Sequence, residues 1–341
     1  MYDIRSRRPQ GLRNEGNAGQ VLAEKGTDAR TPVWRSWRTL PLLLVPILLA
    51  RIDLSPRQSV EPADDGGQSP AVAESSILPL HLNDRVLTWM NRFRTDQRAE
   101  FEQVLRRRGA YEGLIRARLR ARGMPEELLY LAMMESGLKP RAESSASAVG
   151  LWQFMAPTAQ QYGLRVDEWV DERRDPVRAT DAALDYLSWL HARYGSWYLA
   201  AAAYDAGPGT VDRVLARHAD GKVHGENVYW EVLDHLPRET REYVPRLVAA
   251  SLLAQDADAA GFDNGVSPYR YDRVFVPGGT SLRAVARILG IDVRVMRSLN
   301  PHLIQGVTPP NETYPVRVPV GTAGKVVAVL GKGRVIRRAD D

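Results

Sequence analysis

Apolar residues recur at helical spacing through the centre of the chain, from Leu80 to about Leu253. Within residues 86–93, for example, large apolar side chains stand at positions i, i+3, i+4 and i+7, and the same pattern starts again at Phe101. Short breaks that contain Gly or Pro separate these segments, and the alternation of β-branched residues that is typical of strands is nearly absent. The sequence therefore predicts a compact, mainly α domain over residues 78–258.

The chain is longer than one such domain. Its 341 residues suggest roughly two domains, and a hydrophobic content of 44% is enough to build their cores. It contains no Cys, which excludes disulfides, a thiolate nucleophile and a Cys-ligated zinc site. Its six His residues show no His-x-x-x-His spacing. We therefore expect neither a metal nor a cofactor.

The net charge of +5 comes entirely from the N-terminus. Residues 1–51 contain nine Lys or Arg against four Asp or Glu, whereas residues 52–341 contain 37 of each kind. A protein that binds nucleic acid needs a basic surface on its folded body. The sequence therefore indicates no nucleic-acid partner.

An apolar run at Leu40–Ala50 follows Arg35 and Arg38. It is too short to cross a hydrocarbon core of ~30 Å, and two prolines within it argue against a buried helix. A basic flank, a short apolar core and a polar sequel are typical of an export signal. Residues 1–51 therefore predict export to the periplasm or cell envelope by a cleaved signal, or retention by a short anchor in the inner or outer membrane. Residues 52–77 are predicted to be a linker.

One carboxylate stands out within the helical segment. Pro125 suits the first turn of a helix and Gly137 suits its end, and between them Leu128, Leu131 and Glu135 lie at i, i+3 and i+7. Burial and the negative end of the helix dipole both disfavour an ionised carboxylate there. A carboxylic acid that stays protonated near neutral pH can act as a general acid. Spacing alone leaves open a solvent-facing side chain or an ion pair with Arg.

Four short motifs extend this observation: Glu135-Ser-Gly-Leu-Lys-Pro, Gly150-Leu-Trp-Gln-Phe-Met155, Ala203-Tyr-Asp-Ala-Gly207 and Glu239-Thr-Arg-Glu-Tyr-Val244. In this order and with these separations they resemble the lytic transglycosylases of the soluble-lytic-transglycosylase family, most closely its membrane-bound murein transglycosylase D branch. The stretches Asn83-Asp-Arg-Val and Arg122-Gly-Met-Pro-Glu resemble that branch as well. The resemblance covers about residues 80–255 and implies a lysozyme-like, goose-type helical fold.

The resemblance also implies roles for individual residues. Glu135 matches the single catalytic acid/base of the family, and Tyr243 matches the tyrosine whose hydroxyl contacts it. Ser144 matches the serine that hydrogen-bonds sugar in the cleft. The resemblance therefore predicts a contact between Tyr243 and Glu135, with Ser144 in the substrate cleft.

Four further positions match segments that line the saccharide subsites: Gln153, Met155, Tyr204 and Asp205. Met155 and Tyr204 could also be packing residues. Asp205 departs from the family pattern, which usually has Asn, and an ionised carboxylate accepts hydrogen bonds but cannot donate them. We expect Asp205 either to face the cleft near Glu135 or to replace a structural hydrogen bond, and not to act as a second catalytic carboxylate.

The implied activity is non-hydrolytic cleavage of the β-1,4 bond between N-acetylmuramic acid (MurNAc) and N-acetylglucosamine (GlcNAc). The product would be a 1,6-anhydro-MurNAc end, and the partner would be the glycan strands of peptidoglycan, bound by a monomer. Two alternatives remain open, a lysozyme-like hydrolase that uses water and a non-catalytic scaffold that binds murein.

The C-terminal part changes character over residues 268–320. Two short strands flank two short helices, predicted at Tyr271–Val276, Ser281–Leu289, Val293–Leu299 and Tyr314–Val318. This β-α-α-β order resembles the LysM carbohydrate-binding module, with a degenerate Val-Pro-Gly-Gly-Thr-Ser-Leu start. The module is expected either to bind glycan or to serve as a packing unit only. Residues 321–341 are predicted to be a frayed tail.

Overall fold

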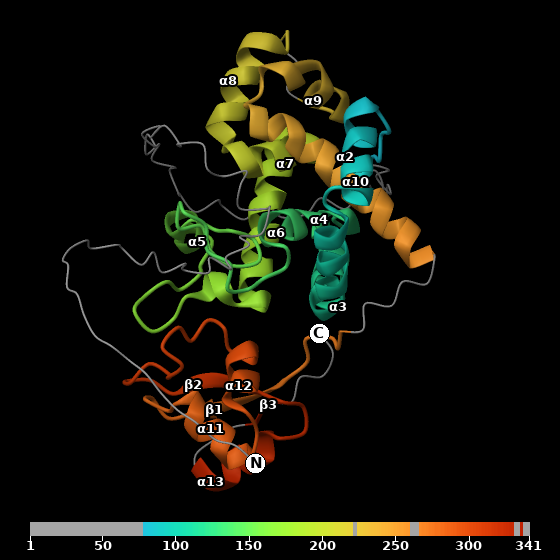
Figure 1. The fold of residues 1–341 in the computed structure, drawn as a ribbon. Coiled ribbons are helices and arrows are strands. Elements are labelled where there is room, and N and C mark those ends of the chain that lie inside the picture. Colours follow the sequence, from blue (N-terminus) through green and yellow to red (C-terminus); the bar gives the residue numbers. More distant parts are fainter. Residues whose placement is uncertain (1–77, 221–223, 260–265, 331–334, 337–341) are drawn as a thin grey trace, which may run out of the picture. The chain divides into compact units, whose positions relative to one another are not determined.

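The computed structural model describes residues 78–220, 224–259, 266–330 and 335–336 (Figure 1). The predicted export segment and linker lie outside these residues. Within them, no helix is both long and apolar enough to cross a lipid bilayer. The predicted order of a mainly helical domain followed by a small β-α-α-β module is confirmed.

The helical domain extends from Leu78 to Ala259 and is built around one buried apolar core. Helix α10 crosses this core and packs against α2, α7 and α4, while α6 packs against α7 and α3 (Figure 1). Its α-helices are α2 (Asp84–Arg94), α3 (Arg98–Ala121), α4 (Leu129–Ser136), α5 (Ala156–Gln161), α6 (Pro176–Tyr194), α7 (Trp197–Ala206), α8 (Pro208–His218), α9 (Glu226–Val232) and α10 (Arg238–Ala259). Short 3-10 turns stand at Glu126–Leu128, Glu172–Arg174 and Leu233–His235.

The ends of these helices follow from their sequences. The Asn83 side chain accepts hydrogen bonds from two backbone N–H groups at the start of α2, and Asp175 and Ser196 cap α6 and α7 in the same way. Helix α4 begins after a 3-10 turn that follows Pro125 and ends at Gly137, which adopts the left-handed conformation. The helix predicted from these last two residues is therefore present.

The C-terminal module contains a three-stranded antiparallel sheet in the order β2-β1-β3. Strand β1 (Asp272–Val276) pairs with β2 (Tyr314–Val318), and Val274 lies opposite Val316. Three helices and a short third strand complete the module: α11 (Leu282–Leu289), α12 (Val293–Leu299), α13 (Ala323–Leu330) and β3 (Val335–Ile336). The valines of β1 and β2 and the apolar stripe of α11 form a second buried core.

The prediction of a frayed tail over residues 321–341 is wrong for helix α13. Ala323 and Val326 of this helix are buried in the core of the module, because its apolar positions recur at i and i+3. The short strand β3 then pairs with β1.

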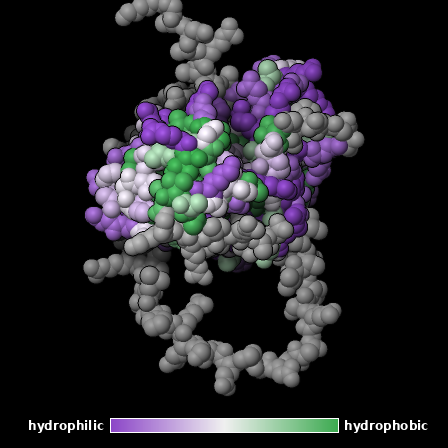
Figure 2. All heavy atoms as spheres, turned by 90° about the horizontal axis from the view of Figure 1, so that it is seen from below, coloured by the Kyte–Doolittle hydropathy of each residue, from purple (hydrophilic) through white to green (hydrophobic). Residues whose placement is uncertain are grey.

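Not all large apolar side chains of the module are buried. Figure 2 shows an apolar area among hydrophilic atoms on one face of the molecule. Val295, Ile304, Val320 and Val329 are the exposed large apolar residues of the described part of the module.

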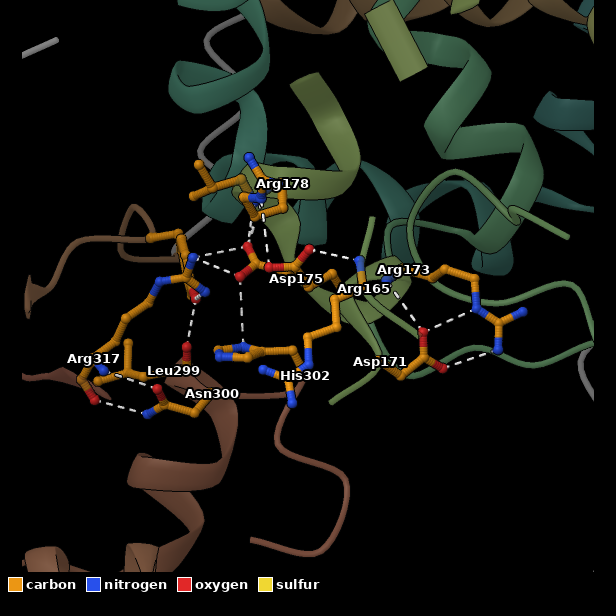
Figure 3. Close-up of polar contacts among 12 residues, drawn as sticks. Arg165, Asp171, Arg173, Asp175, Arg178, Leu299, Asn300, His302 and Arg317 are labelled. Atoms are coloured by element: carbon orange, nitrogen blue, oxygen red, sulfur yellow. Dashed lines mark hydrogen bonds and ion pairs between the residues drawn. The ribbon is translucent and has the colours of Figure 1, made fainter. Parts of the chain in front are cut away.

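A buried ionic cluster ties the module to the helical domain (Figure 3). Both carboxylate oxygens of Asp175, at the start of α6, accept from the Arg317 guanidinium of β2, at 2.7 and 2.8 Å. Burial alone would raise the pKa of Asp175, but the charge of Arg317, joined by His302 once acid protonates it, outweighs burial and holds that pKa below its usual range. The backbone N–H of Asp171 also donates to the carbonyl oxygen of His302, at 2.9 Å. The junction is therefore a specific, desolvated contact.

His302 gives this junction a predictable response to acid. Burial lowers the pKa of His302 to about 4, although Asp175 attracts the protonated form. At neutral pH the imidazole is therefore uncharged, and its Nδ1, 3.5 Å from the Asp175 carboxylate, forms no ion pair. Because the pKa is lower in the folded state than the ordinary 6.5, protons bind preferentially to the unfolded chain. The neutral imidazole of His302 therefore makes its full contribution to the free energy of unfolding above pH 6.5, and this contribution is lost as the pH falls towards 4.

We therefore predict that acid destabilises the wild-type chain more than a His302→Phe variant. Between pH 7.5 and pH 5 the wild type should lose roughly 2 kcal/mol of unfolding free energy that the variant keeps, since phenylalanine takes up no proton. Urea unfolding at both pH values measures the difference. Equal losses in the two proteins would contradict the lowered pKa of His302.

Candidate active site

Glu135 lies in the last turn of α4, a helix whose other residues are all buried. Among the eight residues of α4 it is the one that is partly exposed, while the others are buried. The helix therefore brings a single carboxyl group to the edge of the core. The Glu135 side chain is thus neither fully exposed to solvent nor deeply buried.

Tyr243 of α10 donates a hydrogen bond from its hydroxyl to Oε1 of Glu135, at 2.7 Å. The two residues are 108 positions apart in sequence, and the packing of α10 against α4 brings them together. Burial raises the pKa of Tyr243 well above its usual range, and negative charge on Glu135 raises it further. The phenol therefore stays a neutral hydrogen-bond donor at any pH at which the chain would work.

Asp205, the departure from the family pattern, is held by a structural hydrogen bond. Its Oδ2 accepts from the hydroxyl of Thr240, at 2.8 Å, and Thr240 is fully buried one turn before Tyr243 on α10. Asp205 is also close enough to contribute to the raised pKa of Tyr243. It is thus a neighbour of the Glu135–Tyr243 pair, linked to it through α10.

Arg246 is a residue that the motif comparison did not reveal. It follows Tyr243 by three positions on α10, and its guanidinium lies over the ring of Trp89, 5.2 Å from the centroid. Burial lowers the pKa of Arg246, while Tyr243, Glu135 and Asp205 oppose that change. The helical spacing from Tyr243 is the sequence signal that could have found it.

The loop between α4 and α5 carries Ser144 and Gln153. The Ser144 hydroxyl oxygen accepts from the N–H of Ala148, at 3.0 Å, which leaves its own hydrogen able to donate. The Gln153 amide donates to the carbonyl oxygen of Gly150, at 2.9 Å, and its backbone is left-handed, with φ of 50°. Both side chains are half-buried along one loop that starts next to Glu135.

Gly150 is a position where only glycine fits. Its φ is 89°, and a Cβ there would lie 1.7 Å from the carbonyl oxygen of Arg173. The buried guanidinium of Arg173 in turn donates to the carbonyl oxygens of Ser147 and Phe154. This close backbone approach fixes the loop that carries the candidate binding residues.

Met155 and Tyr204 differ in how far they are exposed to solvent. Met155 is 44% exposed at the start of α5, so it is not a core residue. Tyr204 is half-buried against the core, and its hydroxyl donates to the carbonyl oxygen of Trp152, at 2.8 Å. Tyr204 therefore braces the same loop, through the residue next to Gln153. In the described part of the chain, no cluster of His, Asp and Glu is suited to hold a metal ion.

Two family profiles match the chain, one in each domain. Residues 113–224 match the family profile of the transglycosylase SLT domain, and residues 270–334 match that of the LysM-like domain of the lytic transglycosylase MltD. Of the site residues predicted from the sequence, the first match includes all except Tyr243.

Several individual proteins are similar to this chain. Membrane-bound lytic murein transglycosylase D of Escherichia coli K12 is 29% identical over 242 residues, which are 70% of this chain and 52% of that protein. A putative tributyltin chloride resistance protein of Alteromonas is 36% identical over 96 residues, 28% of this chain and 46% of that protein. The solved 70 kDa soluble lytic transglycosylase of E. coli aligns over 46% of this chain and 25% of its own, with 24% identity and a TM-score of 0.38. The chain spans about half the length of the first curated relatives that it matches.

Proposed function

Because this chain carries an SLT domain followed by an MltD-type LysM-like domain, it belongs to the lytic transglycosylase family, and we propose that it cleaves peptidoglycan without consuming water. The bond cleaved is the β-1,4 linkage from MurNAc to GlcNAc, and the product is a 1,6-anhydro-MurNAc end. The observation that supports this most strongly is the 2.7 Å hydrogen bond from Tyr243 to the half-buried Glu135.

In the first half of the reaction, protonated Glu135 donates its proton to the glycosidic oxygen. The bond between MurNAc C1 and that oxygen breaks, and GlcNAc leaves as an alcohol. Positive charge develops at C1, and the N-acetyl oxygen of the substrate itself can stabilise it. General acid catalysis of this kind contributes typically about 10²–10⁴-fold to a rate.

In the second half, the Glu135 carboxylate takes the proton of the MurNAc C6 hydroxyl. The C6 oxygen then bonds to C1 and closes the anhydro ring, while Glu135 regains the proton that it gave away. One carboxyl group is therefore enough, in contrast to most glycosidases, which need two. Asp205 is not needed as a second one, in keeping with its hydrogen bond from Thr240.

Tyr243 acts in this scheme as a positioning residue. Its neutral phenol donates to Oε1 of Glu135 and so orients the carboxyl group that exchanges protons with the substrate. Ser144 and Gln153 would orient sugar hydroxyl and acetamido groups, and exposed Met155 would supply an apolar contact to a sugar ring. The C-terminal module would add a second contact to the glycan.

The site of action in this proposal is the cell envelope, where peptidoglycan lies. The membrane-bound relative from E. coli supports that location. Export or anchoring through residues 1–51 remains a prediction from the sequence.

The nature of the new sugar end tests this proposal. The full-length chain is incubated with purified sacculi, and the released muropeptides are identified by mass spectrometry. Anhydro-MurNAc ends are expected. Reducing MurNAc ends would instead indicate a lysozyme-like hydrolase, and intact sacculi would indicate a scaffold that binds murein without cleaving it.

Asp205→Asn is predicted to leave turnover within about twofold of the wild type. Asparagine keeps an oxygen that can accept from the Thr240 hydroxyl, so the structural hydrogen bond survives the loss of charge. The rate of anhydro-muropeptide release measures the effect. A fall of a hundredfold would mean that the charge of Asp205 takes part in the reaction.

A further inference from the structure

A pocket of about 490 Å³ lies beside the loop that follows Glu135. Six of its wall residues matter for what it can bind: Arg107 and Tyr111 of α3, Leu138, Lys139 and Arg141 of the loop, and Ser298 of α12. The loop segment 138–142 begins three residues after Glu135 and ends two residues before Ser144. The pocket is therefore built on the segment that connects two candidate site residues.

Arg107 and Arg141, together with Lys139, bring positive charge to this pocket. The Arg107 Nε donates to the carbonyl oxygen of Gly137, at 2.7 Å, and Arg141 donates to that of Arg297, at 2.8 Å. Within the described residues neither guanidinium forms an ion pair, although Glu100 attracts Arg107 at longer range. An exposed cationic side chain without a carboxylate partner is common, because water solvates its charge. Two cationic side chains that line the same cavity, however, create a positive potential inside it.

The surroundings of Arg141 strengthen that potential. Burial lowers the pKa of Arg141, and repulsion from Arg174 and Arg297 lowers it further. An anion placed between Arg107 and Arg141 would relieve this repulsion and could accept from both guanidinium groups. Such charge-assisted hydrogen bonds to a carboxylate are among the strongest that proteins form.

Apart from Lys139 and Ser298, the rest of the wall is mainly apolar. Tyr111, Leu138, Pro140 and Val266 surround the charged groups. A pocket with this lining selects a ligand that combines a carboxylate with a small apolar body. A bare inorganic anion would leave the apolar wall unused, and a neutral sugar would leave the cations without a partner.

Building on the proposed function, we propose that this pocket binds the peptide stem of the peptidoglycan strand. The stem is attached to the lactyl group of MurNAc, the sugar whose C1 would react at Glu135. The stem carries carboxylates as well as the methyl groups of its alanines, and this combination of charge and small apolar groups matches the lining of the pocket. The pocket would make the chain prefer strands that still carry their stem peptides.

The activity test compares two substrates, intact glycan strands and strands from which an amidase has removed the stem peptides. The Arg107→Gln/Arg141→Gln variant is expected to lose at least about tenfold in kcat/KM on peptide-bearing strands and to be unchanged on stripped strands. A double variant with lysine at both positions keeps the charge and should retain most of the activity. Arg106→Gln, an exposed neighbour on α3 that does not line the pocket, is the matched control. An equal loss on both substrates, or no loss, would overturn the proposal.

A binding measurement separates this proposal from the proposed function. Calorimetry with a soluble MurNAc-tripeptide, in the absence of turnover, should give a Kd at least about fivefold weaker for the double glutamine variant than for the wild type. Inorganic phosphate, the anionic probe without an apolar body, should not compete at millimolar concentration. If the wild-type chain releases no anhydro ends but binds the tripeptide through these arginines, the proposed reaction is refuted and the proposed peptide pocket stands. An unchanged Kd, or displacement by phosphate, would refute the pocket alone.

Discussion

Glu135→Gln is predicted to abolish the release of anhydro-muropeptides and to leave the fold intact. Glutamine is nearly isosteric and can still accept from the Tyr243 hydroxyl, so the contact of α4 with α10 survives. It cannot give a proton to the glycosidic oxygen or take one from the C6 hydroxyl, and both halves of the reaction fail together. Loss of general acid and base catalysis should lower kcat by about 10³-fold or more.

The matched control is Glu102→Gln on α3, where a partly exposed glutamate pairs with Arg98 outside the site. It should keep full activity. Circular dichroism and the melting temperature of both variants should equal those of the wild type. A Glu135→Gln protein that folds and still releases more than a few per cent of the wild-type product would refute the role of this residue.

Arg317→Met is expected to have the largest effect on stability. It leaves the carboxylate of Asp175 buried without its cation, and such an unpaired charge costs about 3–5 kcal/mol. The expected result is a loss of that size in the free energy of unfolding, measured in urea. Arg273→Met, an exposed arginine on the neighbouring strand β1, should cost less than about 0.5 kcal/mol.

A second substitution tests the reason for this loss. In Asp175→Asn/Arg317→Met the buried charge is gone, and asparagine can still cap α6. The double variant should therefore be more stable than Arg317→Met alone. If it is less stable, or if Arg317→Met costs no more than the Arg273 control, the ion pair does not hold the module to the helical domain.

The helix that carries Glu135 could be predicted because its signals are local. Pro125 and Gly137 mark its ends, and the leucine stripe between them indicates the buried face. The strands and helices of the module follow from equally local patterns. Helix α13 was missed because a Gly- and Lys-containing sequence near a chain end looks like a tail, although Val326 fills the core of the module.

The contact of Glu135 with Tyr243 could not be derived from spacing. The two residues come from helices that meet only through tertiary packing, so the family resemblance alone pointed to their contact. The junction of Asp175, Arg317 and His302 was not foreseen either, since a buried ion pair between two domains leaves no periodic pattern in a sequence. In the same way, Met155 could be assigned to the surface only once its exposure was known.

The most direct test of the reaction is digestion of sacculi in water enriched in oxygen-18. If the C6 hydroxyl of MurNAc attacks C1, as proposed for Glu135 and Tyr243, the new MurNAc ends carry no heavy oxygen. If water attacks instead, each new end carries one heavy oxygen at C1. Mass spectrometry of the muropeptides distinguishes the two: unlabelled anhydro ends are predicted, and labelled reducing ends would contradict the account.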